Sequence, residues 1–179
     1  MPELTLPTSD VHASFLAAMD EFRAEGRGGP DDSSMIGHEM QDYGARWTDR
    51  GVFEEYVRWL RDQSLADSPR AAGWVPSTTL WWVSGQEYLG RVAIRHWLTP
   101  RLLEVGGHIG YDVRPSARRR GHATALLAAT LPWAARLGID RALVTCDEDN
   151  TGSRKVIEAN GGRLEDQRGI TMRYWVPTS

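Results

Sequence analysis

The spacing of apolar residues in the first third of the chain is typical of amphipathic helices. Apolar side chains recur at intervals of three and four residues from Val11 to Arg23, which predicts a helix. The same spacing from Phe53 to Leu60 predicts a second helix. The segment from Gly26 to Trp47 contains many Gly, Pro, Asp and Ser residues and little periodicity. We therefore expect a long loop there, with a short helix around Met35–Tyr43.

The rest of the chain alternates between strand-like runs and helical segments. Thr, Val, Ile and Trp dominate the two central runs, and Gly85-Gln86 between them is typical of a hairpin turn. The predicted strands are Leu4–Leu6, Thr78–Ser84, Glu87–His96, Gly107–Val113, Arg141–Cys146 and Ile170–Val176, and the further helices are Gly121–Leu137 and Thr151–Asn160. The predicted order is β-α-α-β-β-β-α-β-α-β-β, which places the chain in the α+β class as one domain over residues 1–179.

Composition narrows the class of protein further. No apolar run is long enough to cross a membrane, and the first residues lack the pattern of a secretory signal. The single Cys146 cannot form an internal disulfide, which is compatible with the cytoplasm. A formal net charge of −3 argues against a general nucleic-acid binder. We expect a cytoplasmic protein with no nucleic-acid or membrane partner and no metal, and we leave a homodimer open.

Three consecutive basic residues stand where a predicted strand turns into a predicted helix. Arg118, Arg119 and Arg120 stand between the strand that ends at Val113 and the helix that starts at Gly121. The first turn of a helix presents unpaired N–H groups at the positive end of the helix dipole, where an anion can bind. Gly121 has no Cβ to block a close approach. The segment therefore predicts a cradle for a phosphate or diphosphate group.

This segment resembles a motif of the GNAT acyltransferase superfamily. Arg118-x-x-Gly121-x-Ala123 is similar to the superfamily's pyrophosphate loop, Gln/Arg-x-x-Gly-x-Gly/Ala, which binds acyl-coenzyme A. The order of elements from roughly Leu4 to Val176 is also similar to the GNAT fold, and Gly106–Tyr111 with Arg95-His96 resembles a bacterial subset of acetyltransferases. The resemblance implies a central mixed β-sheet flanked by helices, acetyl-CoA as the acyl donor and an amine as the acceptor.

A second motif supports the resemblance about thirty residues later. Asn150 stands where a predicted strand ends and a helix begins, and in similar proteins an Asn there caps the helix and touches the pantetheine arm. The resemblance implies that two neighbouring strands, Gly107–Val113 and Arg141–Cys146, splay apart to admit that arm, with Gly110 easing a bulge. The cofactor-binding residues that it implies are Tyr111, Asp112, Val113, Arg118, Arg119, Arg120, Gly121, His122, Ala123, Thr124, Asn150 and Ser153.

Acyl transfer needs a neutral amine, a group that holds the oxyanion and a proton for the leaving thiolate. The backbone N–H near Tyr111 is the predicted oxyanion donor. His108, His96 and Glu39 are the candidate bases, with His108 preferred because it lies nearest the predicted thioester. A structural role for His108 is equally open. Cys146 as a covalent carrier is disfavoured, since a lone Cys on an apolar strand is usually inert.

The sequence departs from the family pattern at the general acid. Many relatives carry a Tyr seven residues after the motif Asn, whereas this chain has Ile157. In place of that Tyr, either Ser153 or water protonates the thiolate, or the thiolate leaves without gaining a proton. Acidic residues in the first long loop favour a cationic amine acceptor, and Asp147 stands after a splayed strand where it could attract one. Three alternatives remain open, namely a non-catalytic acyl-CoA sensor, a nucleic-acid-binding module that uses the three consecutive arginines, and an acyltransferase with a longer acyl donor.

Overall fold

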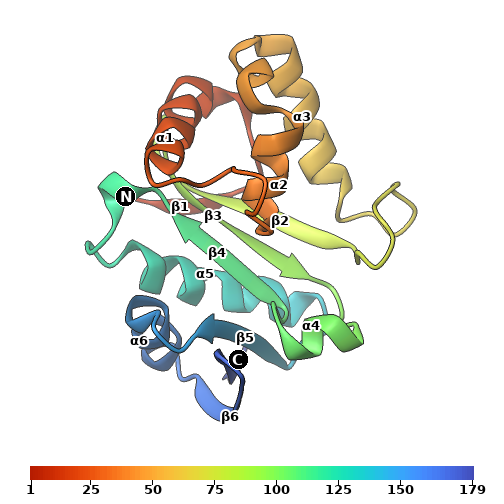
Figure 1. Ribbon diagram of the computed structural model, residues 1–179, viewed down its shortest axis with the longest axis vertical. Helices are drawn as coiled ribbons and strands as arrows, with labels where there is room; N and C mark the ends of the chain where they lie inside the picture. Colours follow the sequence, from red (N-terminus) through yellow and green to blue (C-terminus); the bar gives the residue numbers. More distant parts are fainter.

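Seven strands form two antiparallel sheets in the computed structural model, which describes all 179 residues (Figure 1). The four-stranded sheet has the order β1-β2-β3-β4, and the three-stranded sheet has the order β5-β7-β6. The strands are β1 (Glu3–Thr5), β2 (Ser77–Ser84), β3 (Glu87–Arg95), β4 (Ile109–Val113), β5 (Arg141–Asp147), β6 (Arg163–Arg168) and β7 (Thr171–Pro177). The two sheets adjoin at β4 and β5, which are connected through a crossover helix, as parallel neighbours require.

The helices lie on both faces of the four-stranded sheet (Figure 1). They are α1 (His12–Ala24), α2 (Met35–Asp42), α3 (Arg50–Asp62), α4 (Pro100–Glu104), α5 (His122–Arg136) and α6 (Thr151–Ala159). The predicted α+β fold is confirmed. The short helix expected around Met35–Tyr43 is confirmed as α2, which the side chain of Ser34 caps. The short helix α4, capped by Thr99, was not predicted. No helix combines the length and the apolar character that a membrane crossing would require.

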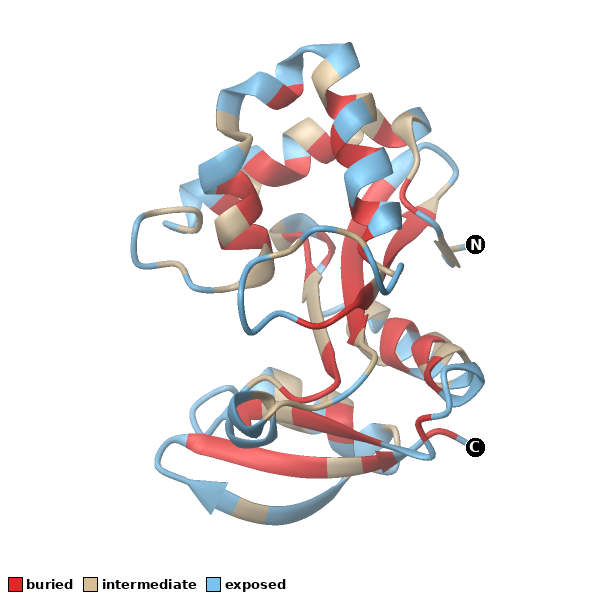
Figure 2. Ribbon diagram, turned by 90° about the vertical axis from the view of Figure 1, so that its right-hand side faces the viewer, coloured by how far each residue is buried: buried red, intermediate tan, exposed pale blue.

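Alternation along the strands divides the buried side chains between two cores. On β2, Leu80 and Trp82 belong to a core of 19 residues beneath α5, whereas Trp81 and Val83 belong to a core of 15 residues beneath α1, α2 and α3. Successive strand residues point to opposite faces, so a single strand serves both cores. Figure 2 shows buried residues along the strands and along the helix faces that cover them. The four-stranded sheet is therefore covered on both faces.

The two sheets touch at one end of β4 and separate from there. The N–H of His108 donates to the carbonyl of Leu143 at 2.8 Å, and this is the one backbone hydrogen bond between the β4 and β5 segments. Gly107 makes the contact possible, because a Cβ there would clash with the Leu143 carbonyl and its φ of +61° is left-handed. The expected bulge at Gly110 is wrong, since β4 keeps a regular register with β3. The sheets splay because pairing stops after His108.

We expect Gly107→Ala to destabilise the protein by about 3 kcal/mol or more, since it adds a backbone clash to left-handed strain. Gly85→Ala is the matched control, because Gly85 has a φ of +58° but a Cβ at this position would meet nothing within 4 Å. Strain alone should cost that variant about 1–2 kcal/mol. Urea unfolding measures both. Equal losses of unfolding free energy in the two variants would contradict a close approach of Gly107 to the Leu143 carbonyl.

Candidate functional site

An opening lies between the diverging strands β4 and β5. Its volume is about 290 Å³, and it is lined by Arg95, Val105, Gly106, Ile109, Gly110, Tyr111, Thr145, Cys146, Asp147, Asn150, Ser153 and Thr171. Ile109 and Cys146 belong to the core beneath α5, and Tyr111 packs against that core. Because strand side chains alternate, Gly110, Thr145 and Asp147 belong to the opposite face. The opening therefore joins the two faces of the sheet.

Three polar side chains meet on the α5 side of this opening. The Tyr111 hydroxyl from β4 lies 2.7 Å from the Ser153 Oγ in the first turn of α6. The N–H of Ser153 donates to the Oδ1 of Asn150, so Asn150 caps α6 as predicted. Burial raises the pKa of Tyr111 to about 12, although its hydrogen bond to Ser153 opposes the shift. Tyr111 and Ser153 thus form a neutral hydroxyl pair across the gap between the sheets.

The segment before α5 presents a row of free backbone donors. The N–H groups of residues 119–124 donate to no acceptor of the chain. Gly121 is the N-cap of α5 with a φ of +82°, and a Cβ there would meet nothing within 4 Å. Arg119 also adopts a left-handed conformation, with a φ of 59°. Free N–H groups at the positive end of a helix are suited to bind a phosphate group.

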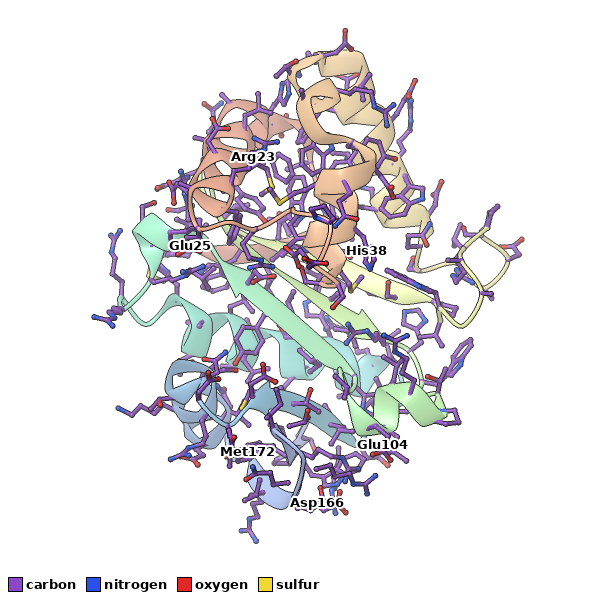
Figure 3. All side chains as sticks on the ribbon, viewed as in Figure 1. Arg23, Glu25, His38, Glu104, Asp166 and Met172 are labelled. Atoms are coloured by element: carbon purple, nitrogen blue, oxygen red, sulfur yellow. The ribbon has the colours of Figure 1, made fainter.

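The three consecutive arginines of this cradle have different surroundings. Arg118 donates from Nε to the carbonyl of Val113 and from both terminal nitrogens to the carboxylate of Glu25. Figure 3 shows Glu25 at the end of α1, beside this segment. Arg119 and Arg120 are exposed, and their side chains form no ion pair or hydrogen bond. Two of the three charges are therefore free to meet an anion, and the third holds the cradle to α1.

A second anchor of the cradle was not identified from the sequence. The carboxylate of Glu21 on α1 accepts from Nε and Nη2 of Arg114 and from the N–H and hydroxyl of Ser116. Burial alone would raise the pKa of Glu21, but the hydrogen bonds from Arg114 and Ser116 outweigh burial and lower it. Glu21 lies 93 residues before Arg114 in the chain, so no local pattern predicts the pair. Both anchors fix the cradle before any ligand arrives.

Comparison with known families agrees with this geometry. Residues 35–163 match the model of the acetyltransferase (GNAT) domain. The chain belongs to the GNAT acetyltransferase family. The chain is therefore an acetyltransferase by family membership. Among curated proteins, no sequence matches this GNAT chain.

Solved structures share the fold at low sequence identity. RimJ of Mycobacterium smegmatis in complex with CoA-disulfide is 17% identical, with a TM-score of 0.65 over 98% of this chain and 80% of that protein. The microcin C7 self-immunity acetyltransferase MccE, in complex with acetyl-CoA and AMP, is 11% identical, with a TM-score of 0.62 over 98% and 92%. The ribosomal L7/L12 alpha-N-protein acetyltransferase RimL, in complex with coenzyme A, is 17% identical, with a TM-score of 0.61 over 98% of this chain and 93% of that protein.

The structure does not bring the three candidate bases into the opening of this GNAT fold. His108 is buried beside it, and its Nδ1 accepts from the N–H of Leu143 at 2.9 Å. His96 pairs through Nε2 with the hydroxyl of Thr78 at 2.8 Å. Glu39 is buried in the core beneath α1 to α3, where it pairs with Arg91 and accepts from the Tyr56 hydroxyl. Each of the three already has a structural partner.

Several other predicted residues have roles that the sequence did not indicate. The carboxylate of Asp112 accepts from Arg27, which also pairs with Asp32. Burial would raise the pKa of Asp32, but hydrogen bonds from Ser34, Gly28 and Arg27 lower it strongly. Of the acidic residues in this loop, Asp32 and Glu39 are therefore paired with arginines, whereas Asp31 and Asp42 form no ion pair. Ile157 is fully buried, so its position offers no acid.

Three further predicted residues lie around the cradle and the opening. His122 accepts through Nδ1 from the indole N–H of Trp82 at 3.2 Å. Ala123 and Thr124 lie in the first turn of α5 with free N–H groups. Cys146 is buried, which, together with the charge of Asp147, raises the pKa of its thiol. A thiol with a raised pKa is a poor nucleophile, which agrees with direct transfer rather than a covalent route.

We expect the pKa of His108 to set part of the pH dependence of stability. Burial and the charge of Arg95 lower this pKa below the usual 6.5, so the unfolded chain binds the proton more readily. The contribution of neutral His108 to the free energy of unfolding should be fully present above the pKa that this histidine has in the unfolded chain. It should be lost as the pH drops below that pKa. Urea unfolding of wild type and His108→Asn measures the effect, since Asn keeps an acceptor for Leu143 but does not titrate.

Turnover of the same variants separates a structural role from a catalytic one. His108→Asn should retain activity near neutral pH, whereas His108→Ala should lose about 1–3 kcal/mol of stability by leaving the Leu143 N–H unpaired. An equal loss of kcat in both folded variants would identify His108 as the base instead.

Proposed function

We propose that this chain transfers the acetyl group of acetyl-CoA to a primary amine by direct attack in a ternary complex. The observation that carries the proposal is the opening between β4 and β5, which joins the two faces of the sheet next to the hydroxyl pair Tyr111–Ser153. A donor on one face and an acceptor on the other can meet there without a covalent enzyme intermediate. The cytoplasmic location and the homodimer stay predictions.

The donor side is assigned to the face that carries α5 and α6. The free N–H groups of residues 119–124, with Arg119 and Arg120, are suited to bind the diphosphate. The backbone of Tyr111 to Val113 lies on an edge of β4 that no strand pairs. Apart from the Val113 carbonyl, which accepts from Arg118, this edge can bind the amides of the pantetheine arm. Asn150 caps α6 beside this path and has an amide NH₂ with no acceptor in the chain. These groups support a donor site on this face of the sheet.

The chemistry requires one bond to form and one to break. The nitrogen lone pair of the neutral amine attacks the thioester carbon, the C–N bond forms, and the C–S bond breaks as the thiolate leaves. A backbone N–H near Tyr111 stabilises the oxyanion of the intermediate. Ser153 gives its proton to the thiolate, and the Tyr111 phenol can replace that proton through their shared hydrogen bond. The amine loses its own proton to solvent or to Asp147.

A thiol-release screen with acetyl-CoA tests the activity. Panels of small amines, amino acids and peptides with free N-termini should contain at least one acceptor that accelerates thiol release above the rate of hydrolysis. Slow hydrolysis with every acceptor would indicate an acyl-CoA sensor instead. Faster thiol release from a longer acyl-CoA than from acetyl-CoA would indicate an acyltransferase that uses a longer acyl donor.

We expect Gly121→Ala to weaken acetyl-CoA binding about tenfold or more, because a Cβ would project into the space where the diphosphate approaches. Gly138→Ala is the matched control at the other end of α5. Gly138 has a φ of +81°, and a Cβ there would also meet open space, so both variants carry the same strain. Calorimetric titration with acetyl-CoA compares them. Equal affinities in the two folded variants would refute the cradle assignment.

We expect Ser153→Ala to lower kcat by about a hundredfold with little change in the KM for acetyl-CoA. Tyr111→Phe should cost less, and the double variant should be no slower than Ser153→Ala, because the two hydroxyls act as a unit. Tyr174→Phe, which removes a buried phenol elsewhere in the same core, is the control. Initial rates measure all four variants.

The same assignment predicts the alkaline side of the pH profile. Since burial raises the pKa of Tyr111 to about 12, the rate should stay on a plateau up to about pH 10. A steep fall above about pH 9, with the protein folded and the donor saturating, would show that a different acid operates.

A further inference from the structure

Arg95 is a cation without a counter-ion on the acceptor side of the opening. It lies at the end of β3, is half-buried and forms no ion pair. Its Nη1 donates to the carbonyls of Gly106 and Gly107 at 3.0 and 3.1 Å. Its Nε and Nη2 have no acceptor in the chain. A guanidinium removed from water usually has a carboxylate or phosphate partner, so these free donors are unusual.

The residues around Arg95 leave the space beside its free Nε and Nη2 donors open for a ligand. Gly110 on β4 faces Arg95, and a Cβ there would lie 3.7 Å from Nη1 and 3.8 Å from Nη2. Any larger side chain at this position would cover the guanidinium. The other buried arginines differ, since Arg91 pairs with Glu39, Arg114 with Glu21, and Arg173 with Asp166. In contrast to these three arginines, Arg95 has no acidic partner.

Asp147 supplies the opposite charge across the same opening. It ends β5 on the face opposite the α5 core, and its carboxylate forms neither an ion pair nor a hydrogen bond. Asp147 and Arg95 do not pair with each other, although both line the opening. A small ligand with an amine and an anionic group can therefore meet one unpaired charge at each end.

We propose that the acceptor is an amine that carries a carboxylate, with the carboxylate bound by Arg95 and the amine held beside Asp147. The inference rests on the proposed acetyl transfer and deepens it, since it names the chemical class of the acceptor. Arg95 is thereby a specificity-determining residue. Its planar guanidinium presents the free Nε and Nη2 donors side by side, which matches the two oxygens of a carboxylate. An amino acid is the simplest ligand with this pattern.

The test uses pairs of acceptors that differ only in the anionic group. Initial rates with saturating acetyl-CoA are measured for L-alanine, L-phenylalanine, L-methionine and L-glutamate and for the carboxamide of each at its α-carboxyl group. Wild type should prefer the acid over the amide in kcat/KM by about ten- to a hundredfold for at least one pair, because the amide cannot accept a charge-assisted hydrogen bond. Wild type that prefers the amides, or that acetylates no member of any pair, would overturn the inference.

Variants of Arg95 assign the preference to this residue. Arg95→Gln should bring the acid-to-amide ratio close to one, mainly through a higher KM for the acid, while Arg95→Lys should keep part of the preference. Arg101→Gln, which removes an exposed charge on the neighbouring α4, is the control and should leave the ratio unchanged. An unchanged ratio in folded Arg95→Gln would overturn the assignment.

Donor binding distinguishes this inference from the activity on which it rests. Calorimetric titration with acetyl-CoA should give the same affinity for wild type, Arg95→Gln and Arg101→Gln, since Arg95 lies on the acceptor side. Wild type that binds acetyl-CoA and acetylates only amines without a carboxylate would refute the inference and leave the proposed acetyl transfer standing. Wild type that does not bind acetyl-CoA would refute both.

Discussion

The strands β4 and β5 are held together at one end and left unpaired along the rest of their length, and the candidate site depends on this arrangement. One backbone hydrogen bond, from His108 to Leu143, and the return bond from the Leu143 N–H to the His108 ring form the junction. Beyond it, backbone groups that a continuous sheet would pair are left for a ligand. The two antiparallel ladders on either side keep the strands straight, so the gap persists without a bound donor.

Charge pairing within the protein determines which groups remain free at the site. Most acidic residues near the cradle and in the first long loop already have basic partners, as Glu21, Glu25 and Asp32 do. These contacts hold the cradle and the loop in place, and they remove those carboxylates from substrate recognition. The charges left unpaired at the proposed site are Arg119 and Arg120 on the proposed donor side and Arg95 and Asp147 on the proposed acceptor side. This division agrees with an anionic donor and a zwitterionic acceptor.

The proposed general acid comes from a different part of the fold from the one that the family pattern uses. Ile157 fills the core where relatives carry a Tyr, and a Cβ at Gly162 would clash with its Cγ2, so the two positions are matched in size. A phenol reaches the opening from β4 instead, because Tyr111 extends across the gap to Ser153. The hydroxyl pair thus connects β4 to α6 at the place where the thiolate is expected to leave.

Local sequence determined most helices and strands and the segment of the cradle, because periodicity, capping residues and a glycine at a helix start act over a few neighbouring residues. It gave no range for β6 or α4. It also identified Asn150 as a cap, whereas the absence of the usual acid at Ile157 followed from the resemblance to the family. Tertiary structure decided which charges are satisfied, since Glu39, Glu21 and Arg27 find partners 52, 93 and 85 residues away. It also decided that His108 holds a junction and that Arg95 has no partner, because both depend on how two sheets meet, which no local pattern encodes.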